Sequence, residues 1–143
     1  MSPGTPSEQS GDMQTRTNTS TPLRVYVVED SVPIRERLET MITDAGATVA
    51  GHAGTVAGAI EGILAEHPAL VIMDAQLADG TGFEVLRAIH RQEPGVDVYF
   101  CSSHSDDAYR QYAVKLGARG FFDKSSEFDQ LREVVTRRAA ATH

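Results

Sequence analysis

The sequence predicts an α/β fold: one doubly wound sheet of five parallel strands, covered by helices on both faces. The first observation is that short apolar runs alternate with stretches of helical periodicity from Leu23 onward. The second is that glycines and prolines stand where these segments should begin or end. The third is the length of 143 residues, which suits a single domain with a sizeable core.

Five apolar segments are the predicted strands: LRVYVVE, ATVAGHAG, ALVIMD, VDVYFCSS and RGFFDK, in chain order. Pro68 and Pro94 precede the third and the fourth of them. In a doubly wound sheet the connections are right-handed, and ligands bind at the carboxyl ends of the strands, where the strand order reverses. With the order 2-1-3-4-5, strands one and three are neighbours.

Five helices are predicted from apolar stripes with helical spacing. Ser31 with Pro33 marks the start of the first helix, and Gly46 and Gly117 stand where helices should stop. The stripes, in chain order, are Ile34, Leu38, Met41 and Ile42; Val56, Ile60, Ile63 and Leu64; Val85, Leu86 and Ile89; Tyr109, Tyr112, Ala113 and Leu116; Phe128, Leu131, Val134 and Val135.

Residues 1–22, MSPGTPSEQSGDMQTRTNTSTP, contain no Val, Ile, Leu or Phe and are rich in Ser, Thr, Pro and Gly. Such a segment cannot bury enough apolar surface to offset its ordering entropy, so it is predicted to be a disordered tail. Residues 23–143 contain no internal repeat or linker and are predicted to form one domain. Because few residues follow the last predicted helix, no output domain is expected after it.

The bulk composition excludes several classes of protein. The chain is 41% hydrophobic and 23% charged, as globular proteins are, and its formal net charge of −7 argues against a general nucleic-acid binder. The single cysteine, Cys101, allows no internal disulfide and fits a reducing cytoplasm. No apolar run approaches the roughly 18 residues of a membrane span, and no signal peptide is visible. We expect a cytoplasmic protein that binds neither membrane nor DNA directly.

Reactive side chains follow the strands that would line the crevice. The first strand ends in Glu29-Asp30, the third in Asp74, the fourth in Ser102-Ser103 and the fifth in Lys124. Carboxylates crowded at neighbouring strand ends repel, so one must protonate or a cation must bind, and hard oxygen ligands with room for water suit Mg²⁺. A carboxylate, a metal, a lysine and a hydroxyl together fit a phosphoryl group carried on an aspartate.

Four segments in register carry a resemblance to a known family: VVEDS, VIMDAQLADGTGFEVLR, FCSSHSD and LGARGFFDKS. Over 23–143 the chain resembles the receiver domain of two-component response regulators, of the stand-alone chemotaxis-receiver type. The resemblance implies a flavodoxin-like (βα)5 single domain with the strand order 2-1-3-4-5.

The resemblance also implies a divalent cation, Mg²⁺ or another such as Mn²⁺. By position, Asp30 binds this metal directly and Glu29 assists through water. Asp74 contributes its carboxylate, and Gln76 offers its backbone carbonyl.

The remaining roles concern the phosphoryl group. Asp74 is the implied phospho-acceptor, Lys124 pairs with the phosphoryl group, and the hydroxyl of Ser102 follows it. Phe121 occupies the family's aromatic switch position and is implied to rotate inward when Ser102 moves. His104 would flank the phosphoryl group together with Gln76, and we hypothesise that it influences access of water.

Three positions depart from the commonest family pattern. Ala78 replaces a frequent proline in the loop after Asp74, and Phe121 lacks the hydroxyl of the frequent tyrosine. Ser125 stands where many relatives have a proline after a cis bond, so the isomer of the Lys124–Ser125 bond stays open. A cis bond before serine would cost about 2.5–4 kcal/mol.

The implied function is a single-domain response regulator. A histidine kinase or a histidine phosphotransfer protein would donate a phosphoryl group to Asp74 in a Mg²⁺-dependent reaction. The signal would leave through the surface of the fourth helix, fifth strand and fifth helix, through which a homodimer could also form. The domain would catalyse only its own phosphorylation and dephosphorylation, so it is not expected to be an enzyme with a separate substrate.

The sequence leaves several alternative functions open. A phosphorelay shuttle and a switch acting on one protein partner are equally compatible with the sequence. A binding module that works without phosphorylation is the main alternative. An aspartate-nucleophile phosphatase is disfavoured because Gln76 replaces its second acid, and a flavin carrier because Glu29-Asp30 would repel the flavin phosphate.

Overall fold

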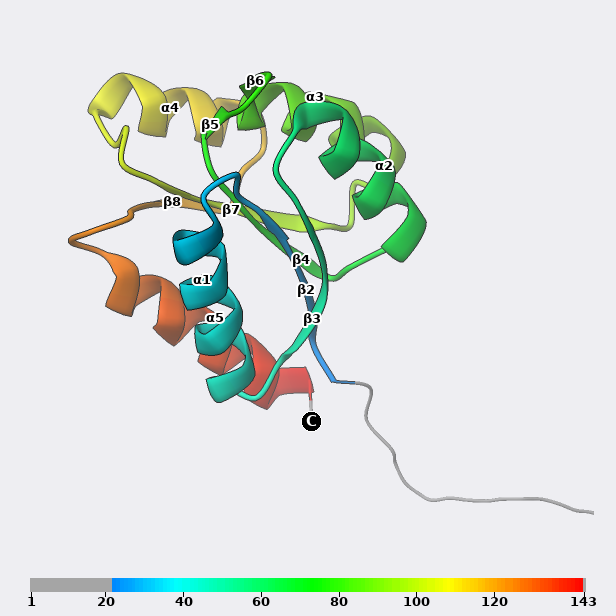
Figure 1. Ribbon diagram of the computed structural model, residues 1–143, viewed down its shortest axis with the longest axis vertical. Coiled ribbons are helices and arrows are strands. Elements are labelled where there is room, and N and C mark those ends of the chain that lie inside the picture. The colour runs from blue at the N-terminus through cyan, green and yellow to red at the C-terminus, as the bar shows by residue number, and fades with distance from the viewer. Residues whose placement is uncertain (1–21, 143) are drawn as a thin grey trace, which may run out of the picture.

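The computed structural model describes residues 22–142, so the predicted tail at 1–22 lies almost entirely outside the described residues. Five parallel strands form the central sheet in the order β3-β2-β4-β7-β8 (Figure 1), which is the predicted order 2-1-3-4-5. The strands are β2 (Arg24–Val28), β3 (Thr48–Ala53), β4 (Leu70–Met73), β7 (Asp97–Ser102) and β8 (Gly120–Asp123).

Helices cover both faces of this sheet (Figure 1), as predicted. On one face lie α1 (Val32–Asp44) and α5 (Phe128–Thr142), packed against Val25 and Val27 of β2 and Leu70 and Ile72 of β4. On the other face lie α2 (Val56–Glu66), α3 (Gly82–Gln92) and α4 (Asp107–Lys115). None of the helices in the described chain is both long and apolar enough to cross a membrane.

The central strand β4 shows why the sheet needs both layers. All four of its residues are buried, and they alternate between the two hydrophobic clusters. Leu70 and Ile72 face α1 and α5, whereas Val71 and Met73 face the three helices on the opposite side. A continuous apolar run is what a strand buried on both faces requires.

Local sequence signals set the helix ends. Ser31 is the residue before α1 and Pro33 lies in its first turn, where the missing N–H costs nothing. Gly46 and Gly117 follow α1 and α4 with φ angles of 92° and 106°, a left-handed conformation that glycine adopts without strain. Thr81 begins α3 with a complete capping box to Glu84.

The structure differs from the predicted elements in two places. A short antiparallel pair, β5 (Gln76–Leu77) and β6 (Gly80–Thr81), follows β4 and was not predicted, because two-residue strands leave no periodic signal. In α4, only Ala113 of the predicted apolar stripe is buried, and Tyr112 is 39% exposed. The hydroxyl of Tyr112 reaches outward to accept a hydrogen bond from Arg87.

Cys101 offers a test of this packing. The side chain is buried in β7, and burial raises the pKa of the thiol to about 12. Because the thiolate is the reactive form, we expect iodoacetamide at pH 8 to leave the folded protein unmodified and to label Cys101 only in denaturing urea. Intact mass spectrometry reads both states. Labelling of the folded protein at the rate of the unfolded chain would contradict the buried position.

Candidate functional site

Three carboxylates meet at the carboxyl edge of the sheet, where β2 and β4 end side by side. One carboxylate oxygen from each of Glu29, Asp30 and Asp74 lies within 4.8 Å of the others. Glu29 and Asp74 are only 2% and 7% exposed, whereas Asp30 faces solvent. The sheet creates this cluster because β2 and β4 pair in parallel, with Val28 opposite Met73.

Lys124, directly after β8, brings positive charge to this cluster. Its Nζ lies 3.0 Å from Asp74 Oδ2, to which it donates a hydrogen bond, and 3.0 Å from Glu29 Oε1. Burial disfavours the charged ammonium, but the hydrogen bond and charge of Asp74, and then the negative charge of Glu29, outweigh that cost and raise the pKa of Lys124. Lys124 is therefore protonated and fixed between the two buried acids.

One lysine does not fully compensate the acids. Burial, and next the charge of Asp74, raise the pKa of Glu29 despite its contact with Lys124 and a hydrogen bond from the Ser31 backbone N–H. Within the described chain, Glu29 Oε1 is buried and accepts no hydrogen bond, so its contact with Lys124 is an ion pair only. Hard oxygen ligands with a lone pair to spare are what Mg²⁺ or Mn²⁺ takes. The donor set thus fits the predicted divalent cation.

Ser102 ends β7 and Lys124 directly follows the neighbouring strand β8, and the two residues are joined by a backbone hydrogen bond. The N–H of Lys124 donates to the carbonyl of Ser102 over 3.0 Å, next to the paired residues Ser102 and Asp123. The Ser102 side chain is fully buried, and its Oγ accepts a hydrogen bond from the His104 N–H. That bond holds the hydroxyl toward the loop after β7.

Gln76 contacts Asp74 through the backbone: its N–H donates to Asp74 Oδ1 over 3.3 Å. The side-chain amide donates to the hydroxyl of Tyr109 in α4, and the ring of His104 stacks against Tyr109 with centroids 5.9 Å apart. Gly82 starts α3 so close to Asp74 that any side chain there would overlap the Asp74 carbonyl oxygen. The sequence predicts Tyr109 only as part of the apolar stripe of a helix, and no local signal indicates its contact with Gln76.

Phe121 lies in β8, opposite Phe100 of the neighbouring strand β7. The ring is 7% exposed and stacks on Phe100, with centroids 5.6 Å apart and planes inclined by 20°. The guanidinium of Arg110 lies 5.6 Å from the centroid of the same ring. The aromatic side chain is therefore buried in this structure, which has a free Asp74 carboxylate.

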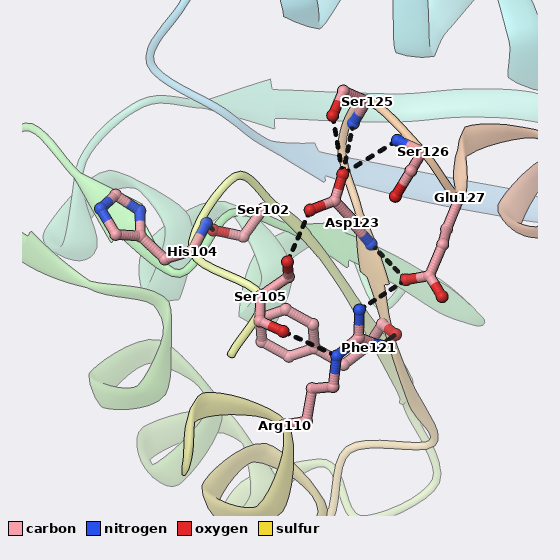
Figure 2. Close-up of polar contacts among 9 residues, drawn as sticks. All are labelled: Ser102, His104, Ser105, Arg110, Phe121, Asp123, Ser125, Ser126 and Glu127. Atoms are coloured by element: carbon pink, nitrogen blue, oxygen red, sulfur yellow. Dashed lines mark hydrogen bonds and ion pairs between the residues drawn. The ribbon is translucent and has the colours of Figure 1, made fainter. Parts of the chain in front are cut away.

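The loop that carries Lys124 is organised by the residue before it. Asp123 Oδ1 accepts hydrogen bonds from the Ser125 N–H, the Ser125 hydroxyl and the Ser126 N–H, as Figure 2 shows. The hydrogen bond from the Ser105 hydroxyl makes the largest contribution, and together with these donors it holds the pKa of Asp123 far below its usual range. All peptide bonds among residues 22–142 are trans, so the Lys124–Ser125 bond is trans.

Proteins of one family resemble this chain over most of its length. Residues 25–136 match the family model described as response regulator receiver domain. The chain is 29% identical to the chemotaxis protein CheY of Thermotoga maritima over 80% of its own length and 95% of that protein. It is 31% identical to the regulatory protein LuxO of Vibrio cholerae over 76% of its own length but only 24% of LuxO.

Solved structures give the same result. The receiver domain of the response regulator NarL from Mycobacterium tuberculosis superimposes with a TM-score of 0.75 and 28% identity, covering 83% of this chain and 97% of that one. The fold is thus the flavodoxin-like fold of receiver domains. The chain belongs to the response regulator receiver domain family of two-component signalling.

Charge repulsion in the acidic cluster leads to a prediction about stability. Replacing Asp30 with Asn removes one of three mutually repelling charges, so we expect the free energy of unfolding to rise by about 1 kcal/mol without divalent metal. The same change should abolish the stabilisation that millimolar Mg²⁺ gives the wild-type protein. Urea unfolding with and without Mg²⁺ measures both effects.

Glu61→Gln is the matched control, because this acid is exposed on α2 and has no ion pair within the described chain. It should leave the Mg²⁺ effect intact. An Asp30→Asn variant that is still stabilised by Mg²⁺ as strongly as the wild type would argue against Asp30 as a metal ligand.

Proposed function

We propose that this chain is a phospho-acceptor switch that takes a phosphoryl group from a histidine kinase or a histidine phosphotransfer protein onto Asp74. The observation that carries the proposal is the position of Asp74. Its buried carboxylate ends the central strand, lies 3.0 Å from Lys124 and lies within 4.8 Å of two further acids. Membership of the receiver family supports the same reading.

In the proposed reaction, one Asp74 carboxylate oxygen attacks phosphorus as the bond from phosphorus to the donor's nitrogen or oxygen breaks. The product is an acyl phosphate on Asp74, and the leaving group departs with the electron pair of the broken bond. Glu29, Asp30, Asp74 and the Gln76 carbonyl would hold a divalent cation, which neutralises phosphoryl oxygens when bound. Lys124, 3.0 Å from Asp74 Oδ2, would neutralise a further oxygen.

The chain's own residues also connect the new phosphoryl group to the surface. Ser102 Oγ would exchange its bond from the His104 N–H for one donated to a phosphoryl oxygen. This displaces the loop that leads into α4. The surface made of α4, β8 and α5 would then differ between the two states, and a partner protein would read it.

Incubation with acetyl phosphate and Mg²⁺ tests the proposal directly. We expect intact mass spectrometry to show the gain of one phosphoryl group in the wild type. The gain should be lost in Asp74→Asn and on addition of EDTA, because both the nucleophile and the cation are needed.

Asp79→Asn is the control for this experiment, since Asp79 lies in the exposed loop five positions after Asp74 and contacts the Val56 N–H. It should be phosphorylated like the wild type. A folded wild-type protein that gains no phosphoryl group would favour the alternative, a binding module that works without phosphorylation.

His104 supplies a prediction about the lifetime of the phosphoryl group. Its exposed ring stacks on Tyr109, which is tied to Gln76 beside Asp74. Truncation in His104→Ala would open a path for water, so we expect faster loss of the phosphoryl group after removal of acetyl phosphate. A time course by mass spectrometry measures the rate, and an unchanged rate would exclude this role for His104.

A further inference from the structure

Arg110 of α4 joins three separate segments beside the candidate site (Figure 2). Its Nε donates to the carbonyl of Ser105 in the loop after β7 over 2.8 Å. Its Nη1 donates to the carbonyl of Phe121 in β8 over 2.9 Å, and its Nη2 donates to Glu127 Oε1 over 2.7 Å. The side chain is about one third exposed, so it is partly shielded from water.

Two further hydrogen bonds connect Ser105 and Glu127 to Asp123, so that these residues and Arg110 form one network. The Ser105 hydroxyl donates to Asp123 Oδ2, and Glu127 Oε1 accepts from the Asp123 N–H over 2.7 Å. Ser105 is thus held twice, by Arg110 through its carbonyl and by Asp123 through its hydroxyl. We call the four side chains of Ser105, Arg110, Asp123 and Glu127 the polar latch.

The polar latch spans the two loops that the proposed function requires to move relative to each other. Ser105 lies three positions after Ser102, whose hydroxyl would move toward the phosphoryl group. Asp123 directly precedes Lys124, which stays on the acidic cluster. Moving Ser102 toward Asp74 therefore pulls Ser105 away from groups anchored to β8, unless Arg110 and the start of α4 follow.

Phe121, the aromatic ring at the switch position, is less suited to couple the movement of Ser102 to α4. Phe121 is already buried and stacked on Phe100 while Asp74 is a free carboxylate. Without a hydroxyl, the ring gains no hydrogen bond by turning toward solvent, and exposing it would cost apolar burial. The bonds of Arg110, by contrast, link directly to the loop that moves.

We infer that Arg110 is a positioning residue that couples the phosphorylation state of Asp74 to the position of α4, through the polar latch rather than through rotation of Phe121. This inference rests on the proposed phosphorylation of Asp74. In the unphosphorylated protein the latch holds Ser105, and with it Ser102, away from the acceptor. Binding of a phosphoryl group and movement of Arg110, together with Ser105 and α4, away from Phe121 and Glu127 therefore favour each other, as linkage requires.

Fluorine NMR of protein labelled with 3-fluorotyrosine tests the inference, with beryllium fluoride and Mg²⁺ as the phosphoryl analogue. Tyr112 is the reporter of α4, since it is 39% exposed; within residues 22–142 its hydroxyl hydrogen-bonds to Arg87 alone, and its ring packs on Phe83 of α3. The signals of bound beryllium fluoride report occupancy of the site in the same spectra. In the wild type, we expect the Tyr112 resonance to shift as the site fills.

The test variant is Arg110→Met, which keeps the length of the side chain and removes all three hydrogen bonds. We expect the concentration of beryllium fluoride at half-saturation to fall by about fivefold, the low end of typical coupling between sites. The shift of Tyr112 on saturation should be lost, because α4 no longer follows the loop. Arg110→Lys should behave like Arg110→Met, because one ammonium cannot satisfy three divergent acceptors.

Arg119→Met is the matched control. Arg119 directly precedes β8, at the end of this strand opposite to Asp123, and forms a 3.0 Å ion pair with Asp97 of β7. It should match the wild type in both readouts. If Arg110→Met gives the wild-type half-saturation and the wild-type Tyr112 shift, or if Arg110→Lys restores both, the directed-bond coupling is wrong.

If Arg110→Met does not fold, the same measurements are made on Ser105→Ala. This variant removes only the hydrogen bond from the Ser105 hydroxyl to Asp123. It should shift half-saturation in the same direction by a smaller factor, and wild-type behaviour in it would overturn the inference. Wild-type protein that binds no beryllium fluoride at all would contradict the proposed function, and the coupling with it. That failure is recognisable because no bound fluoride signal appears in any variant.

Discussion

The fixed ammonium of Lys124 between two buried carboxylates is the interaction on which the rest of the site depends. Two acids that are almost fully excluded from water would not both remain ionised without a compensating charge. Lys124 supplies one positive charge to Asp74 and Glu29, with Asp30 beside them. The cluster is left with a shortage of positive charge, and that shortage is the physical reason why its oxygen ligands suit a divalent cation.

This arrangement depends on strand order more than on local sequence. β2 and β4 are neighbours although a strand and two helices separate them in the chain, and β8 lies two strands further along the sheet. The length of the lysine side chain bridges that gap, because its ammonium must reach Asp74 past the end of β7. The hydrophobic residues of β4, buried on both faces, fix the position of the acceptor at the strand end.

The sequence predicted the strands and helices from local signals, and it predicted the acidic cluster because the expected strand order 2-1-3-4-5 makes the first and third strands neighbours. Apolar runs and glycines at helix ends defined the elements, and polar residues after buried strands identified Asp74 and Lys124. The sequence did not predict the contacts of Tyr109, Arg110 and Glu127, because these join residues whose spacing in the chain follows no period. The hydrogen bond from Gln76 to Tyr109 spans 33 positions, and that from Arg110 to Glu127 spans 17.

The departure at Ser125 shows how one such contact changes the design of the site. A proline ring would restrict the backbone after Lys124 covalently, whereas here Asp123 restricts it with hydrogen bonds from Ser125 and Ser126. The same Asp123 carboxylate also accepts from Ser105, so the bonds that shape the lysine loop share an acceptor with those that hold the serine loop. Restraint of Lys124 and restraint of Ser102 are therefore not independent in this chain. A change that loosens one loop must alter the geometry of the other, which a proline at this position would not require.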